Sequence, residues 1–464
     1  FAFAQPLTDD PLMRFSRRDF LQHSAAVAAG FGGLQTLSAN QSDKDALRTE
    51  GYGELQPDPD QILELPKGFR YRIISQAGEL MNDGLVVPGK PDGMAAFPGP
   101  KGTTILVRNH EINPAVTPTA GPFGKDNNKL TDAIRAKLYD PGERPNLGAR
   151  VPCLGGTTTL VYDTQRQRTV QQFLSLSGTL RNCAGGLTPW GSWITCEETV
   201  ERAGKVCSLD HGYNFEVPAT AKPHLAKAVA LKAMGRFNHE AIAVDPKTGI
   251  VYQTEDRHDG LLYRFIPNVK GQLARGGKLQ ALVVEDAEAL DTRNWEKQRV
   301  PVGGKLTVRW LEMDEVESPK DDLRQRGFAK GAARFARGEG MWYAEGSIYF
   351  ACTNGGAKKA GQVWKLTGDT LELFAEPNDK DLCDNCDNLT VTPWGDVVLC
   401  EDGGGEQFLV GITPAGRFYK LGRNAKSNSE FAGATFSPDG STLFVNIQHQ
   451  ALTLAITGPW RDRH

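Results

Sequence analysis

The sequence predicts an all-β fold: a six-bladed β-propeller closed by a strand from its N-terminal part, with loop and helical insertions. The first observation behind this prediction is a duplicated stretch. "NCAGGLTPWGSWITCEE" begins at Asn182 and "NCDNLTVTPWGDVVLCED" begins at Asn385, and both combine Asn-Cys, Thr-Pro-Trp-Gly and a Cys followed by acids. The second is that the core of this unit, a tight turn between two short apolar runs, returns four more times. Such repetition is typical of folds built from one supersecondary unit.

Each unit reads as a β-hairpin. Short apolar runs such as "TILV", "IVYQ" and "TLFV" flank the turns, and two such runs around a Pro/Gly turn predict two paired strands. Further strands follow most hairpins, for example "GLLYRFIP" and "KLQALVVED". Four antiparallel strands in each of six units predict a six-bladed propeller. The six turns are centred on Pro98, Pro189, Pro246, Glu345, Pro393 and Pro438.

The last unit offers only three strand-like runs and ends with "ALTLAIT". The early segment "GFRYRIIS", residues 68–75, is expected to supply the missing strand and to remove a free sheet edge. Two segments, 112–155 and 287–336, interrupt the repeat as insertions that are either walls of a site or solvated decoration. In the second, "KDDLRQRGFAKGAARFAR" after Ser318 predicts a capped helix. Residues 46–464 are therefore expected to form one domain.

Residues 1–45 are predicted to be an export signal and linker. Ser16-Arg17-Arg18-Asp19-Phe20-Leu21 precedes a mild apolar run, which is typical of a bacterial twin-arginine signal. The alternative is an ordinary charged turn before a surface helix. We therefore expect the twin-arginine export machinery to be a partner and the periplasm or the medium to be the destination.

Charge and hydropathy limit the classes of other binding partner that we expect. A formal net charge of −3 gives no electrostatic reason to expect nucleic acid or an anionic membrane. No run of 18 or more apolar residues predicts a membrane-spanning helix. A monomer is expected. Eight cysteines in an exported chain permit disulfides, and their pairing stays open among Cys153, Cys207, Cys383 and Cys386.

A first ring of candidate metal ligands follows from the repeat register. Six positions before each turn centre, the strand nearest the axis is expected to begin, and five of the six residues there can carry a negative charge. Mostly small residues follow them, as a crowded axis requires. Five potential ligands around one axis predict a metal site. The positions are Asp92, Cys183, Glu240, Glu339, Asp387 and Ala432.

A second ring is expected around the first, because the antiparallel second strand returns to the same mouth. In common register its members are all carboxylates or amides. They are Glu111, Glu198, Asp256, Asn354, Asp402 and Gln448. Two positions earlier, Asn109 offers another amide oxygen, whereas Cys196, Cys352 and Cys400 are interpreted as packing residues.

So many clustered carboxylates cannot all stay ionised without compensation. Several bound cations are the economical solution, and pairing with arginine or solvent is the alternative. Hard ions such as Ca²⁺ or Mg²⁺ take oxygen ligands like those of Asn109, Glu111 and Asp256. The thiol of Cys183 is soft and points to a transition metal as well.

With these residues in view, the chain resembles the PhoX-type alkaline phosphatases. The likeness covers nearly the whole chain after the signal and is carried by "GTLRNCAGGLTPWGSWITCEE", "GRFNHEAIAVDP", "VYQTED", Arg337-Gly338-Glu339 and "FAGATFSPDGSTLFVNIQHQ". That family is a six-bladed propeller around an iron–calcium cluster. The resemblance therefore implies Fe³⁺ and Ca²⁺ as cofactors, small-molecule phosphate esters as substrates, and hydrolysis of phosphate monoesters as the reaction.

The resemblance also implies roles for single residues. Arg337 would contact the substrate phosphate, a task suited to a planar guanidinium. "DNCDNLT" replaces a more usual Asp-Pro-Asp-Gly-Leu pattern, which leaves the choice between Asp384 and Asp387 open. The implied iron ligands are Cys183, Glu240 and Glu339. The implied calcium ligands are Asn109, Glu111, Glu198, Asp256 and Asp402, and the ring residues Asp92 and Asp387 complete the expected metal set.

Two other functions stay open. A calcium-dependent propeller hydrolase acting on lactones or phytate would explain the oxygen ligands but gives Cys183 no purpose. A binding module whose calcium ions only brace the axis would be inert toward esters. The metal content separates the first of these from the phosphatase, because the lactonase or phytase reading predicts no iron.

Overall fold

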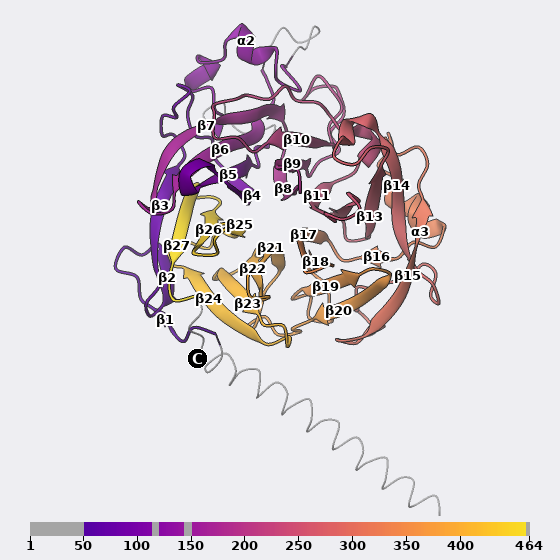
Figure 1. Ribbon diagram of the computed structural model, residues 1–464. Coiled ribbons are helices and arrows are strands. Elements are labelled where there is room, and N and C mark those ends of the chain that lie inside the picture. Colours follow the sequence, from indigo (N-terminus) through magenta and orange to yellow (C-terminus); the bar gives the residue numbers. More distant parts are fainter. Residues whose placement is uncertain (1–50, 114–119, 143–150, 461–464) are drawn as a thin grey trace, which may run out of the picture.

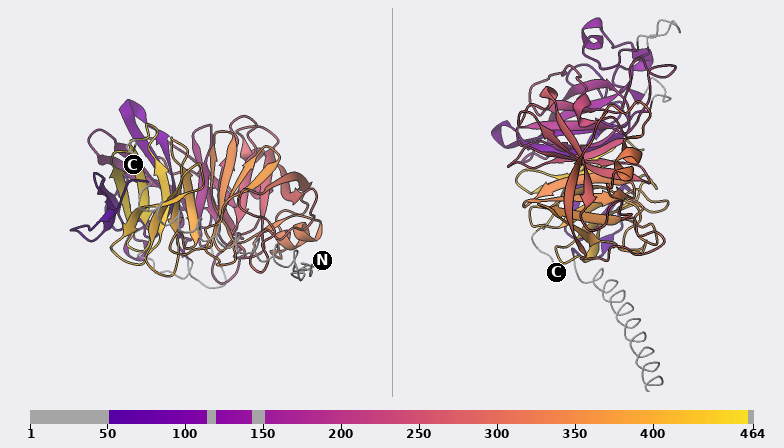
Figure 2. Two further views of the ribbon diagram at one scale, coloured as in Figure 1. Left: turned by 90° about the horizontal axis from the view of Figure 1, so that it is seen from below. Right: turned by 90° about the vertical axis from the view of Figure 1, so that its right-hand side faces the viewer.

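The computed structural model describes residues 51–113, 120–142 and 151–460. Strands dominate these residues and surround a central axis in an all-β, propeller-like arrangement with few helices (Figure 1). Seen from the side, the strands run between the two faces of a flattened body (Figure 2). The predicted export signal, with Arg17 and Arg18, lies outside the described residues.

Six of the described strands line the axis. Each contacts the next one around the axis, and the last contacts the first, so that the inner wall is continuous. All six begin where the repeat register predicts the innermost strands. They are β4 (Pro91–Pro98), β8 (Asn182–Leu187), β11 (His239–Val244), β17 (Gly338–Ala344), β21 (Cys386–Val391) and β25 (Phe431–Phe436).

Every inner strand pairs antiparallel with the next strand of the chain, as the hairpin pattern predicts. These partners are β5 (Thr103–His110), β9 (Ser192–Glu197), β12 (Val251–Glu255), β18 (Ser347–Cys352), β22 (Val397–Glu401) and β26 (Thr442–Ile447). Third and fourth strands extend four of the sheets outward. They are β6 (Gly155–Asp163), β7 (Arg168–Thr179), β13 (Gly260–Pro267), β14 (Gly277–Val284), β19 (Gln362–Thr367), β20 (Thr370–Ala375), β23 (Phe408–Ile412) and β24 (Phe418–Asn424).

An N-terminal strand completes the last sheet. β3 (Arg70–Gln76) pairs antiparallel with β27 (Leu452–Thr457), which gives the strand order β25–β26–β27–β3. The predicted closing strand is therefore confirmed. Two more N-terminal strands, β1 (Leu55–Gln56) and β2 (Leu63–Pro66), add to β24 and widen its sheet to six strands.

The second repeat has three strands, where four were expected. After β9 comes β10 (Asn214–Pro218), and the segment beyond it makes only an isolated bridge between Phe215 and Ala230. Pro223 lies in this segment and lacks the N–H that a ladder needs, which opposes strand pairing there.

The second insertion contains a strand that we did not expect. β15 (Lys305–Glu312) pairs with β14 and with β20, and so joins two repeats into one ten-stranded sheet. A short strand, β16 (Arg334–Phe335), pairs with β13.

The expected helix is present as α3 (Leu323–Ala329), but its N-cap is Asp322, whose carboxylate accepts a hydrogen bond from Ser318 (2.8 Å). The other helical segments are α2 (Asp132–Arg135), η1 (Pro100–Gly102), η3 (Lys125–Asn127), η4 (Lys232–Met234) and η5 (Leu273–Arg275).

The hydrophobic core lies between neighbouring sheets. Leu160 of β6 and Phe444 of β26, for example, belong to one cluster between the first and last sheets. The axis itself is too narrow for side chains, as the sequence predicts. A Cβ atom on Gly93 would lie 2.5 Å from Ala184 Cα, and one on Gly340 would lie 2.5 Å from Leu389 N. The close approach of these strands is what brings their first residues together at one mouth.

Candidate metal centre

The predicted inner-ring residues occupy equivalent places in the structure. Each is the second residue of its inner strand: Asp92, Cys183, Glu240, Glu339, Asp387 and Ala432. A register shift interrupts each inner hairpin at or directly after this residue. Such bulges re-aim side chains at the end of a strand. Six repeated bulges therefore free the ring residues from the ladder at the same end of the axis.

The outer ring follows the partner strands. Five of its residues stand one position beyond the strand end: Glu111, Glu198, Asp256, Asp402 and Gln448. The backbone N–H of each donates to the carbonyl of the residue two positions before the inner-ring residue, for example Glu198 N to Arg181 O (2.9 Å).

In the fourth repeat our register was one residue too late. Thr353, not Asn354, makes the equivalent bond, from its N–H to Arg337 O (3.0 Å), because β18 ends at Cys352. Asn354 contacts His258 and Trp295 instead. The outer ring therefore has a hydroxyl at this position, where an amide was expected.

A third set of residues, the approach positions, stands two residues before each inner-ring residue: Lys90, Arg181, Asn238, Arg337, Asn385 and Glu430. Lys90, Arg181, Arg337 and Asn385 have positive φ values of 50°, 45°, 52° and 57°. This conformation is uncommon outside glycine and collects at functional sites. Sequence reasoning missed the set as a whole, although the same repeat register could have found it.

Four of the six approach residues follow a simple contact rule, in which the side chain reaches the outer-ring residue of the preceding repeat: Lys90, Arg181, Arg337 and Glu430. Lys90 Nζ lies 2.8 Å from Gln448 Oε1. Arg181 Nε lies 3.1 Å from Glu111 Oε1, and its Nη2 lies 2.5 Å from Glu198 Oε2. In the last repeat the rule brings two acids together, because the carboxyl groups of Glu430 and Asp402 lie within 4.8 Å of each other.

Arg337 obeys the same rule and spans both rings. Its Nε and Nη2 donate to the two carboxylate oxygens of Asp256 (2.8 and 3.0 Å), and Nη2 also reaches Glu339 Oε1 (2.8 Å). The Arg337 side chain stays 28% exposed while Glu339 is buried. The guanidinium therefore sits at the rim of the mouth, with its carboxylate partners beneath it.

Negative charge is in large excess at this mouth. Against the three cations Lys90, Arg181 and Arg337 stand nine carboxylates: Asp92, Glu111, Glu198, Glu240, Asp256, Glu339, Asp387, Asp402 and Glu430. Burial together with nearby carboxylates raises the pKa of Asp387 to about 7 and that of Glu430 to about 11. Burial and the same repulsion raise the pKa of Glu240, and both of its carboxylate oxygens are buried without a hydrogen-bond partner. A buried carboxylate left in this state costs several kcal/mol unless a cation compensates it.

The ligand atoms gather in three groups, and within each group they lie no more than 4.8 Å apart. The groups are Glu111–Cys183–Glu198, Glu240–Glu339–Asp387 and Asp387–Asp402–Glu430. The first offers a thiol and the other two offer only oxygen. The unpartnered oxygens of Glu240 and this mixed donor set fit bound metal ions. The thiol of Cys183 falls in the group of Glu111 and Glu198, whereas the resemblance placed it with Glu240 and Glu339.

Three other expected residues are also placed. Asp387 belongs to two of the groups, whereas Asp384 pairs with Lys380 (2.7 Å), so Asp387 holds the ring position. Asp92 lies in the ring and accepts a hydrogen bond from Gln448 (2.6 Å). Asn109 does not fit our expectation, as its contacts show.

The structure does not support Asn109 as a metal ligand. Its amide nitrogen donates to the carbonyls of Cys183 and Ala184 (3.1 and 2.7 Å), and its amide oxygen accepts from Trp193 Nε1 (2.8 Å). The whole amide is thus used to tie the first repeat to the second. Asn109 still lies within β5, beside the second repeat, whereas Glu111 stands beyond the strand end at the mouth.

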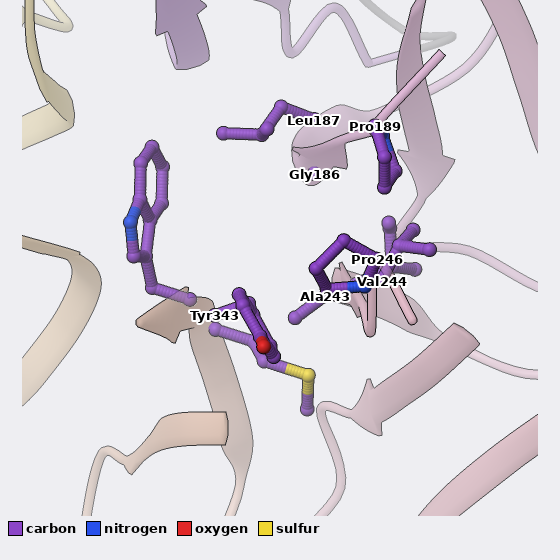
Figure 3. A pocket seen from close by; sticks show the side chains of 10 residues that line it. Gly186, Leu187, Pro189, Ala243, Val244, Pro246 and Tyr343 are labelled. Carbon is purple, nitrogen blue, oxygen red and sulfur yellow. The ribbon is translucent and has the colours of Figure 1, made fainter. Parts of the chain in front are cut away.

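The far end of the axis has a different character. An apolar pocket lies at the opposite ends of three inner strands, lined by residues such as Leu187, Val244 and Tyr343 (Figure 3). None of its lining residues is acidic or a cysteine. At these three strands the acidic and thiol side chains of the rings therefore lie at the mouth, and apolar side chains line the opposite end.

Fold and site together define a metal-dependent enzyme on a propeller-like scaffold. The family model for the alkaline phosphatase PhoX matches residues 50–451, and the chain belongs to this family. It is accordingly a metal-dependent alkaline phosphatase.

Among solved structures, the chain is similar to Pseudomonas fluorescens PhoX in complex with vanadate, a transition state analogue. The identity is 18% and the TM-score 0.63, with 89% of this chain and 98% of that chain covered, which supports the shared fold. A gluconolactonase from Xanthomonas campestris is 13% identical with a TM-score of 0.39, and 88% of this chain and 98% of that one are covered. That likeness is too weak to inform function. A search of curated proteins gave no match.

One expectation about partners can be compared with the structure. Within the part of the chain that the structure describes, no helix has the length and apolar character needed to cross a membrane.

Proposed function

We propose that this phosphatase hydrolyses small phosphate monoesters at the mouth of the inner strands, with iron and calcium as its metals. The observation that carries the proposal is the buried Glu240 carboxylate, whose two oxygens have no partner, within a ring that also contains Cys183. A soft thiol beside carboxylates suits a transition metal, and the oxygen-only groups suit a hard ion.

We infer six blades for the scaffold. Six inner strands contact one another in a closed circle, and β15 is an added strand that fuses the third and fourth blades into one sheet. In this division, the Cys183 blade and the Glu240 blade are neighbours. The inner-ring ligands therefore converge from different blades onto one axis, which favours ions that bridge them.

The proposed ligands fall into an iron set and a calcium set. The family resemblance makes Cys183, Glu240 and Glu339 the iron candidates, although the thiol lies in the group of Glu111 and Glu198. The oxygen-only group of Asp387, Asp402 and Glu430 is the sharpest calcium candidate. Glu111, Glu198 and Asp256 also offer oxygens, although arginines contact all three in the structure. When bound, such ions polarise phosphoryl oxygens and supply or orient an oxygen nucleophile.

The chain's own cations would bind the substrate. Arg337, partly exposed at the rim, can turn two N–H groups toward the equatorial phosphoryl oxygens and stabilise charge there. Arg181 occupies the same approach position two repeats earlier and has a similar exposure of 33%. The two guanidinium groups would act as a pair of phosphate clamps, of which the sequence motifs identified only Arg337.

Export completes the proposal. The "SRRDFL" stretch with Arg17 and Arg18 supports delivery by the twin-arginine machinery to the periplasm or the medium. That route carries folded proteins, so the metals can be loaded before export.

Replacing one thiol tests the metal assignment. Cys183→Ser should lower the iron content and the phosphatase activity while calcium is largely kept, because a hydroxyl is a poor substitute for a thiolate. Cys400→Ser is the matched control, since Cys400 is buried in a hydrophobic cluster. Elemental analysis and hydrolysis of a phosphate monoester should be measured on the same preparations. A Cys183→Ser protein with full iron and full activity would contradict the proposal.

A further inference from the structure

A second cluster of metal-ligating side chains lies apart from the mouth. Asp140, Cys153 and His211 bring one ligand atom each within 4.8 Å of the others, and all three residues are buried. Asp140 and Cys153 come from the end of the first insertion, and His211 comes from the loop after β9. The phosphatase site uses none of them.

The ring of His211 is oriented through its Nδ1, the ring nitrogen that does not face Asp140 and Cys153. Its Nδ1 lies 2.6 Å from Glu197 Oε1, and the Glu197 carboxylate also accepts the N–H groups of Leu180 (3.0 Å) and Gly212 (2.8 Å). With these donors around it, the carboxylate acts as an acceptor, so Nδ1 carries the proton and donates. A carboxylate behind a histidine is the arrangement that fixes the tautomer of metal-binding imidazoles.

The other ring nitrogen faces two further ligand atoms. His211 Nε2 lies 3.5 Å from Asp140 Oδ2 and 3.7 Å from Cys153 Sγ, where the thiol can donate only a weak hydrogen bond. Hydrogen bonds from N–H to oxygen span about 2.7–3.2 Å, so the carboxylate is too far away to satisfy a protonated Nε2 well. The Asp140 carboxylate is itself held in place by backbone, because Oδ2 accepts the N–H groups of Ser208 and Leu209 (2.5 and 3.1 Å). A cation between the three atoms would replace these long contacts with bonds to the thiolate, the imidazole and the carboxylate.

The spacing fits a tetrahedral ion. Zinc bonds sulfur at about 2.3 Å and nitrogen or oxygen at about 2.1 Å, so tetrahedral ligands lie about 3.6 Å (sulfur to nitrogen) and about 3.4 Å (oxygen to nitrogen) apart. The observed separations are 3.7 Å for Cys153 to His211 and 3.5 Å for Asp140 to His211. The donor set of one thiol, one imidazole and one carboxylate is also the kind that zinc prefers.

We propose that Asp140, Cys153 and His211 form a structural zinc site separate from the phosphatase centre, with Glu197 holding the imidazole. The site joins the first insertion to the loop after β9. It also steadies the mouth indirectly: Glu197 accepts the N–H of Leu180 and is followed by Glu198, whose N–H donates to the carbonyl of Arg181.

A disulfide is the competing use of the same cysteine. Cys207 lies with Cys153 and Leu180 in one buried cluster, but its sulfur is not among the three converging ligand atoms. The zinc site therefore requires Cys153 and not Cys207, whereas a disulfide requires both.

The same change, cysteine to serine, made separately at three positions distinguishes the zinc site from a disulfide. Full-length Cys153→Ser, Cys207→Ser and Cys183→Ser proteins should be incubated with Zn²⁺, freed of loosely bound metal and analysed for zinc. We expect Cys153→Ser to bind zinc at least about tenfold more weakly than the unchanged protein. Cys207→Ser should keep both zinc and phosphatase activity, and Cys183→Ser should keep this zinc while losing metal at the mouth.

Two results would overturn the proposal. One is a Cys153→Ser protein that retains zinc as tightly as the unchanged chain. The other is unreduced, denatured protein in which neither Cys153 nor Cys207 reacts with a thiol reagent, which would show the disulfide. Should Cys153→Ser fail to fold, Co²⁺ added to Cys183→Ser protein decides the matter. A thiolate-to-cobalt absorption band supports the site, and its absence overturns it.

Discussion

Two corners of the mouth are built on the same repeat positions and differ in charge. At the Arg337 corner (Asp256, Arg337 and Glu339), the approach residue is a cation that meets an acid of the preceding repeat at 2.8 Å. At the Glu430 corner (Asp387, Asp402 and Glu430), the approach residue is itself an acid and meets another acid. The backbone plan is shared, so the difference rests on the approach side chain.

The pKa of a buried carboxyl group shifts in opposite directions at the two corners. Burial favours a raised pKa for Asp256, but the hydrogen bonds and charge of Arg337 outweigh it and lower the pKa of that carboxyl. Burial and Asp402 instead raise the pKa of Glu430 to about 11. At the first corner the chain supplies a cation that compensates Asp256, whereas the second corner has no cation of its own among its three residues and needs one from outside. One repeat position thus produces either an arginine paired with an acid or a cluster of acids, according to the residue it carries.

Asp387 links the oxygen groups on both sides, and its loss should have the largest effect. Asp387→Asn removes one ligand charge from the Glu240–Glu339 group and from the Asp402–Glu430 group together. We expect phosphatase turnover to fall by about 10³-fold or more as metal is lost from both. Asp384→Asn is the matched control, because Asp384 pairs with Lys380 outside these groups. Equal metal content and activity in the two variants would refute the shared role of Asp387.

Arg337→Ala should follow in size. It removes a donor to the transition state without removing a metal ligand, so turnover should fall by roughly 10² to 10³-fold while iron and calcium remain. Arg337→Lys should recover only part of the loss, because a point charge replaces a two-pronged donor. Metal content, melting temperature and inhibition by inorganic phosphate should be measured together. Unchanged phosphate inhibition in Arg337→Ala would show that the guanidinium only braces Asp256.

At the Glu430 corner, replacing the acidic approach residue by arginine should reproduce the charge arrangement of the Arg337 corner. Glu430→Gln should lower the calcium content by about one ion per chain and activity by about tenfold, since one oxygen ligand is weakened at a distance from Arg337. Glu430→Arg should lose the same ion but keep its melting temperature in a calcium chelator, because the guanidinium now neutralises Asp402. Calcium that stays bound in Glu430→Arg would show that this corner holds no ion.

The repeat register is the reason the inner ring could be predicted from the sequence. Counting from a turn reaches Glu240 or Asp387 correctly, because a hairpin of fixed length ties each turn to its strand start. The same count failed for Asn354, where β18 ends one residue earlier than its equivalents. It also misjudged Asn109, because a residue type alone does not show that Trp193 and two carbonyls already use its amide.

Other features depended on contacts distant in sequence. The pairing of β15 with β14 and β20 required knowing which sheets are neighbours. The approach residues were visible in the repeat, but their contacts cross from one repeat to the preceding one, as for Lys90 and Gln448, which are 358 positions apart. Propeller closure creates such contacts, and local patterning carries no signal for them.

The smallest expected effect is on the pH dependence of stability. It concerns two glutamates, Glu255 and Glu401, which directly precede Asp256 and Asp402 of the two corners. Glu255 and Glu401 are the last residues of β12 and β22, equivalent places in the repeat. Lys420 lies 3.0 Å from Glu401, whereas the nearest guanidinium nitrogen, from Arg324, is 3.6 Å from Glu255. One oxygen of Glu255 is buried without a hydrogen bond, and burial raises its pKa from 4.5 to about 7.

A carboxyl with a raised pKa in the folded state makes the folded protein bind more protons than the unfolded chain between pH 4.5 and about 7. The free energy of unfolding should therefore fall as the pH rises through this window, by up to about 3 kcal/mol from this group. Glu255→Gln is neutral throughout and should remove that part of the slope, whereas Glu401→Gln should remove a smaller part, because burial also raises the pKa of Glu401 but Lys420 opposes the shift. Denaturant titrations from pH 4.5 to 8 with fixed metal concentrations measure the difference between each variant and the unchanged protein. Parallel profiles for Glu255→Gln and the unchanged protein would mean that Arg324 keeps Glu255 ionised, and that both corners have their supporting carboxylates equally well compensated.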